Sequence, residues 1–317
     1  MKKLIAIIAL AVLGVSANAQ TDDVAKEVAG LAKDSKKALE ADSIKPWKIS
    51  GMLSLTASQT SLVNWAAGGD QQIGLNALAS LNANYAKDKH SWQNALIAQY
   101  GTLRLVDEQE DFRKTDDKLQ FSSKYGYALS KKFYYSAIFD YKSQFAKGWT
   151  YNDDETRTLN SECWSPLYLT YTIGIDYQPN EHLAFYLSPL CGKTTVVLND
   201  LLSEAGAFGV EEGSHSRSEF GWYLKANAQY NITKAASLNT NLTLFSNYKD
   251  GFVDEVDVDW NLILTFQINK WLAFNFTSEL IYDEDIAIKE KVNGVEIDRH
   301  SLVQFKDVIG VGLTFKF

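Results

Sequence analysis

The sequence contains few residues that interrupt or cross-link a chain. Its 317 residues include only 4 prolines, 2 cysteines and 2 methionines. Beyond the N-terminal leader, no stretch approaches the roughly 18 consecutive apolar residues that suggest a membrane-spanning helix. Scarce proline leaves room for long uninterrupted strands. Without long apolar runs, any membrane crossing by the rest of the chain must use strands.

The chain is acidic, with a formal net charge of −8. This balance argues against a nucleic-acid partner, because nucleic-acid binding needs basic patches. The sequence also lacks the His and Cys spacing of a metal site. Gly192-Lys193-Thr194 imitates the end of a phosphate-binding loop, but Leu187 stands where that loop needs glycine. We therefore predict no nucleic acid, no metal and no cofactor.

Met1 to Ala19 has the pattern of a secretory signal peptide. Two lysines precede an apolar run that ends at Val15, and Ala17-Asn18-Ala19 forms a small-residue cleavage site. Cys163 and Cys191 would then lie in an oxidising compartment, and the sequence leaves open whether they are bridged. We expect an exported protein.

Residues 20–46 differ from everything that follows them. Val24, Val28 and Leu31 recur at helical spacing among charged residues, and Pro46 follows. We predict a short periplasmic helical segment here. A mobile tail, a plug and a partner-docking helix are the alternatives for its role.

From Trp47 to Phe317 the chain reads as strands with apolar residues at every second position. In residues 166–178, for example, Tyr171, Ile173 and Ile175 alternate with polar residues or glycine. About twelve such segments are predicted: 47–58, 72–85, 91–105, 118–129, 133–146, 166–178, 182–197, 218–232, 236–248, 255–268, 271–283 and 302–317.

Short and mostly long connections alternate between these segments. Tight turns such as Asn269-Lys270 are followed by longer connections such as 284–301. This rhythm is typical of periplasmic turns and outer loops in a transmembrane barrel. Aromatic residues near the strand ends suit the girdles of such a barrel. A β-sandwich also alternates, but its apolar side chains would face inward.

The last segment ends the chain with an apolar alternation. Leu313, Phe315 and Phe317 stand at every second position. The pattern resembles the signal that the barrel-insertion machinery reads in outer-membrane barrels. We predict that machinery, together with outer-membrane lipid, as partners of the protein.

The opposite faces of the strands are rich in amides, hydroxyls and charges. The charged candidates for a lumen or pore are Lys124, Asp140, Lys142, Asp176, Lys225, Asp257, Asp259, Glu279 and Lys306. One interpretation is a polar passage for a hydrophilic solute. The other is a hydrogen-bonded interior that only fills a narrow barrel, since twelve strands lie between the filled and the open sizes.

Two stretches contain residues that a regular barrel strand does not need. One includes Asn64, Trp65, Gly68 and Gly69, and the other surrounds Pro189, which implies a bulge or an end to pairing. We predict that both fold inward over the mouth of the barrel.

At these residues the sequence resembles a known family. Asn64-Trp65-Ala66-Ala67-Gly68-Gly69, with Ser188-Pro189-Leu190 and Phe208-Gly209-Val210, is similar to outer-membrane proteins of Bacteroidota that are catalogued only as a domain of unknown function. The resemblance covers roughly residues 47–317. It implies one outer-membrane β-barrel and no particular activity.

Together these observations predict an all-β protein: a transmembrane antiparallel barrel of about twelve strands in the outer membrane of a Gram-negative bacterium, with a short N-terminal periplasmic helix. The leading function is a pore or transporter for small hydrophilic solutes. The alternative is a non-conducting scaffold or subunit that binds other envelope proteins. We predict no catalytic residues. A lipid-modifying enzyme is the third hypothesis, and it would need Ser and His within hydrogen-bond reach.

Overall fold

The computed structural model describes residues 46–60, 72–106, 112–151, 156–249, 251, 255–269, 271–283, 288–292, 295–299 and 302–316. The predicted leader, and the predicted helical segment before Pro46, lie outside the described residues.

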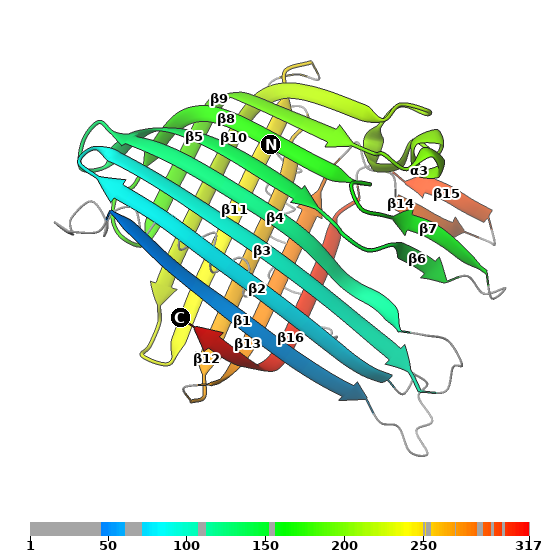
Figure 1. Cartoon of the computed structure of the whole chain (residues 1–317). Coiled ribbons are helices and arrows are strands. Elements are labelled where there is room, and N and C mark those ends of the chain that lie inside the picture. The colour runs from blue at the N-terminus through cyan, green and yellow to red at the C-terminus, as the bar shows by residue number, and fades with distance from the viewer. Residues whose placement is uncertain are drawn as a thin grey trace.

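Within these ranges, twelve strands form one closed antiparallel ring (Figure 1). Each strand pairs with its neighbours in chain order, and the last strand returns to the first. The wall strands are β1 (Trp47–Thr60), β2 (Gln72–Lys87), β3 (His90–Leu105), β4 (Arg113–Ala128), β5 (Phe133–Ser143), β8 (Leu167–Tyr177), β9 (Leu183–Val196), β10 (Ser216–Asn231), β11 (Ala236–Asn247), β12 (Asp257–Gln267), β13 (Leu272–Tyr282) and β16 (Gln304–Lys316). The predicted strand number is confirmed. We call the two ends of the barrel the turn end and the loop end, after the short and long connections.

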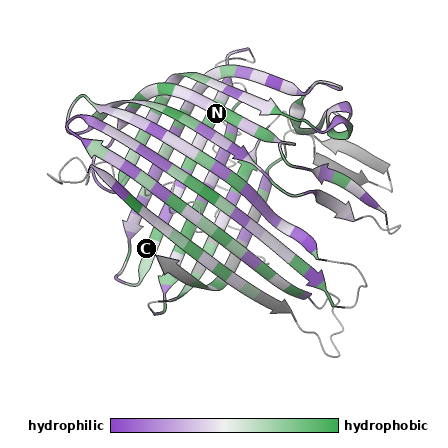
Figure 2. Ribbon diagram, viewed as in Figure 1, coloured by the Kyte–Doolittle hydropathy of each residue, from purple (hydrophilic) through white to green (hydrophobic). Residues whose placement is uncertain are grey.

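Apolar side chains face the surroundings of the barrel and polar ones face its interior. On β8, Ile173 is 63% exposed whereas its neighbour Thr172 is 3% exposed. Figure 2 shows the recurring apolar positions along the wall strands. A soluble sandwich would hide these side chains between its sheets, so the wall is built to contact hydrocarbon.

Aromatic rings form contacts at the turn end of the wall. Trp47 lies with its ring centroid 5.3 Å from that of Tyr85 and 5.9 Å from that of Trp92, and Phe133 stacks on Tyr177 at 4.7 Å. All of these residues lie near a short turn or the start of β1. Amphipathic rings at this level suit the membrane–water interface.

Polar side chains on the outer face of β3 are bonded within the wall. The Ser123 hydroxyl donates to Asn94 Oδ1 at 2.9 Å and accepts from Trp92 Nε1 at 2.9 Å. Thr102 donates to the Arg113 carbonyl oxygen. Because their hydrogen bonds are made locally, these groups can face an apolar medium at reduced cost.

Two small hairpins and a short helix extend the barrel at its loop end. The hairpins are β6 (Gly148–Tyr151) with β7 (Arg157–Ser161), and β14 (Ile288–Val292) with β15 (Val295–Arg299). The helix α3 (Asp200–Glu204) is followed by the 3-10 turn η1 (Ala207–Gly209). The sequence predicted only connecting loops over all of these segments. None of the helices in the described ranges is long and apolar enough to span a membrane.

The helix α3 is held by a cap and a small apolar cluster. Asn199 Oδ1 accepts the backbone N–H of Leu202, which satisfies one of the free donors of the first turn. Val197, Leu202 and Val210 are buried together, with Phe208 packed against them. Residues 157–166 and 197–215, which hydrogen bonds join to each other, therefore form one ordered part of the loop end, and we call them the ordered loop unit.

The predicted interruption at Pro189 is a bulge within the wall. The registers of β9 with β8 and with β10 both shift there, and the Ser188 hydroxyl lies 2.8 Å from the carbonyl oxygens of Ile173 and Leu190. The prediction that Pro189 belongs to a mouth loop is wrong, because β9 continues through it from Leu183 to Val196. Because proline has no N–H to donate, the bulge removes Pro189 from the interstrand hydrogen-bond pattern, and the strand continues on both sides of it.

Candidate functional site

Near the loop end, one lysine holds several carboxylates inside the barrel. Lys193 Nζ lies 2.7 Å from Asp257 Oδ2, 3.5 Å from Asp283 Oδ2 and 3.8 Å from Glu219 Oε2. These residues come from β9, the end of β13, β10 and β12. A single cation shared by three anions leaves this level of the lumen with an excess of acidic groups.

A second cation partly offsets that excess. Arg217 Nη2 lies 2.7 Å from Glu219 Oε1, and the Glu219 side chain is only 4% exposed. Arg217 also donates to the Gly209 carbonyl oxygen at 3.2 Å. The Arg217 guanidinium therefore links the wall strand β10 to η1 in the ordered loop unit, and the Glu219 carboxylate holds it in place. We call Lys193, Arg217, Glu219, Asp257 and Asp283 the loop-end cluster.

Below the loop-end cluster, the lumen contains a cavity of about 200 Å³. Lysines and carboxylates line it from strands around the ring, and hydroxyl and amide side chains fill the spaces between them. The lining residues are Lys118, Gln120, Asp140, Lys142, Tyr168, Thr170, Tyr223, Lys225, Asn241, Thr243, Asp259, Asn261 and Glu279. We call this cavity the chamber.

The charges of the chamber nearly balance. Asp259 interacts electrostatically with Lys118, Lys142 and Lys225, and it accepts a hydrogen bond from the Asn261 amide. The lining holds three lysines against three carboxylates. A polar site with both signs of charge and many neutral donors can bind groups of either sign in a small solute.

Toward the turn end, an ion pair and a tyrosine close the lumen. Lys124 Nζ binds Asp176 Oδ2, which also accepts from Gln178 at 2.9 Å. Tyr186 shares a hydrogen bond of 2.7 Å with Thr172, and Lys124 lies 5.8 Å from the centre of the Tyr186 ring. Strands β4, β8 and β9 thus contribute side chains to one constriction.

The inner side chains around this constriction are close-packed. Tyr186 is 2% exposed, Gln93 2%, Asn239 1% and Ile263 0%. These residues come from β3, β9, β11 and β12, and they include apolar as well as polar groups. The turn half of the lumen is therefore filled by side chains, whereas its loop half contains the chamber.

The structure brings most of the predicted lumen residues together. Asp140, Lys142, Lys225, Asp259 and Glu279 line the chamber, Asp257 belongs to the loop-end cluster, and Lys124 pairs with Asp176. Lys306 stands opposite Glu279 in the strand ladder, and its side chain lies outside the described ones. Their functional role stays a prediction.

The other predicted segments are only partly described. Asn64, Trp65, Gly68 and Gly69 lie outside the described residues, and so does Phe317. Phe315 and Leu313 pair with Leu53 and Leu55, and the Leu313 side chain is 49% exposed on the outer wall.

Sequence reasoning missed Lys193, Glu219, Arg217 and Lys118. Lys193 follows Cys191 at the spacing of an inner face, which is the signal that would have found it. The bulge at Pro189 hid this signal, because it shifts the alternation of β9 by one position.

The cysteines and histidines of the described ranges do not form an obvious reactive group. Cys163 is exposed and Cys191 is buried in the wall, and both are free thiols. His215 Nδ1 lies 2.8 Å from the Val197 carbonyl oxygen, and His215 Nε2 lies 3.6 Å from Asp200. Among the residues that the structure describes, no group of three His, Cys, Asp or Glu side chains converges as a metal site.

A closed antiparallel ring with an apolar outer wall, aromatic rings near its turn end and a polar interior defines the class of protein. It is a transmembrane β-barrel of the outer-membrane type.

Two family models match parts of the chain. A model described as "Protein of unknown function (DUF3078)" matches residues 57–149, and one described as "Protein of unknown function, DUF481" matches residues 169–295. Both descriptions agree with the expected resemblance to barrels of unknown function. No curated protein matches the chain.

Among solved structures, the chain is similar to the COG4313 outer membrane channel from Pseudomonas putida F1, with a TM-score of 0.40 and 10% identity over 88% of this chain and 98% of that one. The NanC porin gives a TM-score of 0.39 and 9% identity over 84% and 100%. The P. putida toluene transporter TodX gives 0.34 and 10% over 86% and 80%. Because these TM-scores are low, the assignment to the class of outer-membrane barrels is based on the barrel wall described above and not on the similar structures.

Proposed function

We propose that the protein is a gated passage for small hydrophilic solutes across the outer membrane. The observation that supports this proposal is the chamber, where lysines, carboxylates, amides and hydroxyls converge on a cavity of about 200 Å³. Ligand pockets for drug-sized molecules are typically larger, from roughly 300 Å³. The solute is therefore of the size of an amino acid or a monosaccharide.

The constriction at Lys124, Asp176 and Tyr186 acts as the gate of this passage. The Tyr186 hydroxyl contacts Thr172 and the Ser136 carbonyl oxygen on neighbouring strands, and its ring lies 6.1 Å from that of Tyr223 inside the barrel. A change of the Tyr186 rotamer, which requires these contacts to break, would open a route past it.

Conductance of the purified full chain in a planar lipid bilayer tests this proposal. We expect small, intermittent conductance steps for the natural sequence, because the gate is closed in its most stable state. Replacing three chamber lysines together (Lys118→Gln, Lys142→Gln and Lys225→Gln) should shift the ion selectivity toward cations, since three carboxylates would then dominate the lining.

The matched control replaces lysines that the structure places at the turn end, outside the lumen. Lys131 and Lys132 lie in the exposed turn between β4 and β5. The Lys131→Gln and Lys132→Gln double variant should keep the natural selectivity. An equal shift in both sets would show that the chamber does not control the passage.

A non-conducting scaffold that binds an envelope protein is the second candidate. It is favoured by the filled turn half of the lumen and by the ordered loop unit, where Trp164, Leu198 and Leu201 are exposed by 48%, 50% and 67%. A folded protein that stays silent in the bilayer, both with its natural sequence and with Tyr186→Ala, would support the scaffold over the passage.

A further inference from the structure

The ring closes through a short seam. β1 pairs with β16 over only four residues, Met52–Leu55 with Leu313–Lys316, whereas it pairs with β2 over all 14 of its residues. On its other side β16 pairs with β13 from Gln304 to Leu313. Figure 1 shows β16 bending away from β1 beyond the paired stretch. In the described ranges, residues 56–60 of β1 and 304–312 of β16 therefore have no ladder partners on their facing edges.

The separation begins at a point of close backbone approach. A Cβ built on Gly312 would lie 2.7 Å from the Thr56 hydroxyl oxygen. Glycine therefore lets β16 touch β1 one position beyond the last pair, Leu55 with Leu313. It also weakens the strand where the bend begins, because glycine within a strand contributes no side-chain packing.

Unpaired strand edges at membrane depth restrict what can occupy the gap. Backbone N–H and C=O groups that face hydrocarbon without partners are costly, and they are tolerated where they line a wet cavity or are covered by polar groups. Pure hydrocarbon would not satisfy these edges. An occupant of the gap needs a polar part as well as an apolar one.

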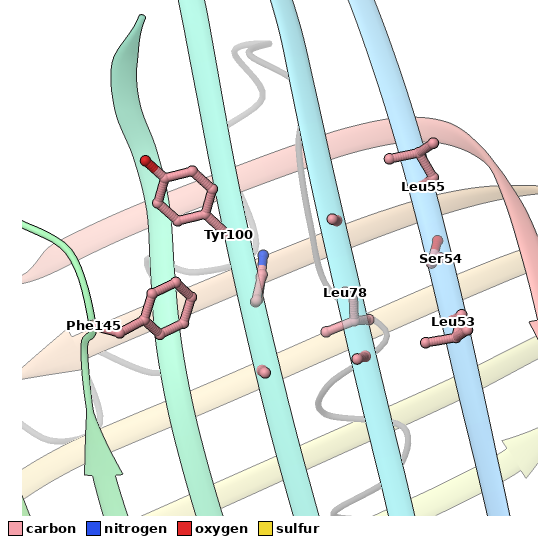
Figure 3. A pocket seen from close by; sticks show the side chains of 10 residues that line it. Leu53, Ser54, Leu55, Leu78, Tyr100 and Phe145 are labelled. Carbon is pink, nitrogen blue, oxygen red and sulfur yellow. The ribbon is translucent and has the colours of Figure 1, made fainter.

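The outer wall beside the seam provides a place for the apolar part. Leu53 and Leu55, which lie on the paired stretch of β1, form one side of a groove of about 360 Å³ (Figure 3). Tyr100 and Phe145, with ring centroids 5.7 Å apart, form the other side. The floor of the groove between the two sides is formed by the small side chains of Ala77, Ala79 and Ala98.

Three apolar side chains also gather on the inner face of the wall at this place, beside buried polar ones such as Ser80 and Gln99. Met52, Leu78 and Ile97 form a buried cluster on β1, β2 and β3, with 5%, 6% and 1% exposure. In contrast, the chamber at β4 to β13 has a polar lining. The outer groove thus suits hydrocarbon, and the wall behind it includes apolar side chains on its inner face.

We propose that the gap between β1 and β16 is a lateral opening that binds a lipid of the surrounding membrane. Its acyl chain lies in the groove of Leu53, Leu55, Tyr100 and Phe145. Its polar head group accepts and donates hydrogen bonds at the unpaired strand edges. This proposal does not depend on solute passage through the chamber, which the conductance experiment tests separately.

The opening is tested by labelling from within the membrane. Single cysteines are introduced at the seam by Ser54→Cys and, in a second variant, Thr56→Cys, after Cys163→Ala and Cys191→Ala remove the natural thiols. The full-length protein is reconstituted with a phospholipid that carries a maleimide on its acyl chain. The matched control is Ser122→Cys, a 4% exposed inner position on β4, which is paired on both sides.

We expect labelling at both seam positions to be about tenfold or more faster than at the control, because a closed strand wall keeps acyl chains out of the lumen. Equal rates at the seam and control positions would overturn the proposal. Protection of the seam cysteines together with a cross-linked second chain would also overturn it, since a protein strand would then complete the ladder.

A second pair of variants tests the groove itself. Ala79→Trp fills its floor, whereas Ala137→Trp fills another outer depression, of about 410 Å³, between the fully paired strands β5 and β8. Lipid that remains bound after detergent exchange is measured by native mass spectrometry. We expect a several-fold loss for Ala79→Trp alone. The same loss in both variants, or in neither, would contradict the proposal.

Discussion

Lys193 Nζ lies 2.7 Å from Asp257 Oδ2, although 64 residues separate the two in the chain. The contact joins β9 to β12 across the interior of the barrel. It also brings two further carboxylates, Glu219 and Asp283, within 3.8 Å of the same ammonium group. The loop end of the lumen is therefore held together by a charge network that no single hairpin contains.

Loss of this ammonium group should destabilise the barrel. Lys193→Met leaves three carboxylates close together with little exposure, and breaking a buried pair in this way typically costs about 3–5 kcal/mol. The measurement is the free energy of unfolding in urea from lipid vesicles. Lys234→Met, at an exposed turn between β10 and β11, is the control and should change it by less than about 0.5 kcal/mol. Similar values for both variants would show that the network contributes little.

Removing the tyrosine ring at the constriction should enlarge the conductance. Tyr186→Ala takes away an inner side chain that is 2% exposed and whose hydroxyl contacts Thr172 and the Ser136 carbonyl oxygen. Larger and longer openings in planar bilayers are the expected result. Tyr135→Ala, on the outer wall at 57% exposure, controls for a general loosening of the barrel and should leave the conductance unchanged. An identical trace for Tyr186→Ala and the natural sequence would exclude Tyr186 as the gate.

The bulge of β9 should not tolerate a side chain at Gly174. A Cβ there would overlap the Leu187 carbonyl oxygen and crowd Ser188. Because these are backbone atoms of a paired strand, we expect Gly174→Ala to cost about 1–3 kcal/mol of unfolding free energy. At Gly126 the nearest atom is the Ser91 hydroxyl, 2.7 Å away, which can rotate. Gly126→Ala should therefore cost less, and the reverse order in urea unfolding would contradict this account of the bulge.

The loop unit should loosen in acid. Asn199 Nδ2 donates to Glu162 Oε2 at 2.7 Å, and Lys147 lies 3.3 Å from Glu162. The hydrogen bond from Asn199 and then the Lys147 contact lower the pKa of the Glu162 carboxyl from its ordinary value. A carboxyl with a lowered pKa stabilises the folded state above its unfolded pKa of about 4.3, and this contribution disappears as the pH falls through the folded value.

Hydrogen exchange of the α3 amides provides the measurement for this pH dependence. Exchange protection should fall as the pH is lowered below about 4.3, and Glu162→Gln should remove that part of the change, because it cannot titrate. The solvent-exposed Glu211 is a matched control on the same loop. Glu211→Gln should keep the natural profile, and a profile that Glu162→Gln leaves unaltered would disprove the role of this carboxylate.

Most of the wall could be predicted because the signals for it are local. The expected segment 72–85 corresponds to β2 (Gln72–Lys87), and 271–283 to β13 (Leu272–Tyr282). A strand that faces hydrocarbon on one side must alternate, and a short turn must carry turn residues. The loop-end hairpins and α3 escaped prediction since they are short and their stability comes from contacts such as Val197 with Leu202.

From the sequence, several residues of the candidate site could be predicted, but the contacts between them could not. Alternation placed Asp259 and Glu279 on the inner face, and in the structure both lie in the lining of the chamber. Which cation faces which anion depends on how far each strand is shifted against the next. The bulge at Pro189 changes that shift for Lys193, and although the proline predicts an interruption of pairing, it does not give the size of the shift.

The amino-acid sequence by itself determined a ring of strands with an apolar outside and a polar inside, because side-chain alternation needs only neighbouring residues. The tertiary structure decided what the ring encloses and where it is incomplete. The filled turn half, the chamber and the four-residue seam between β1 and β16 all depend on strand stagger and closure. These are properties of the whole ring, and they place residues from opposite ends of the chain side by side.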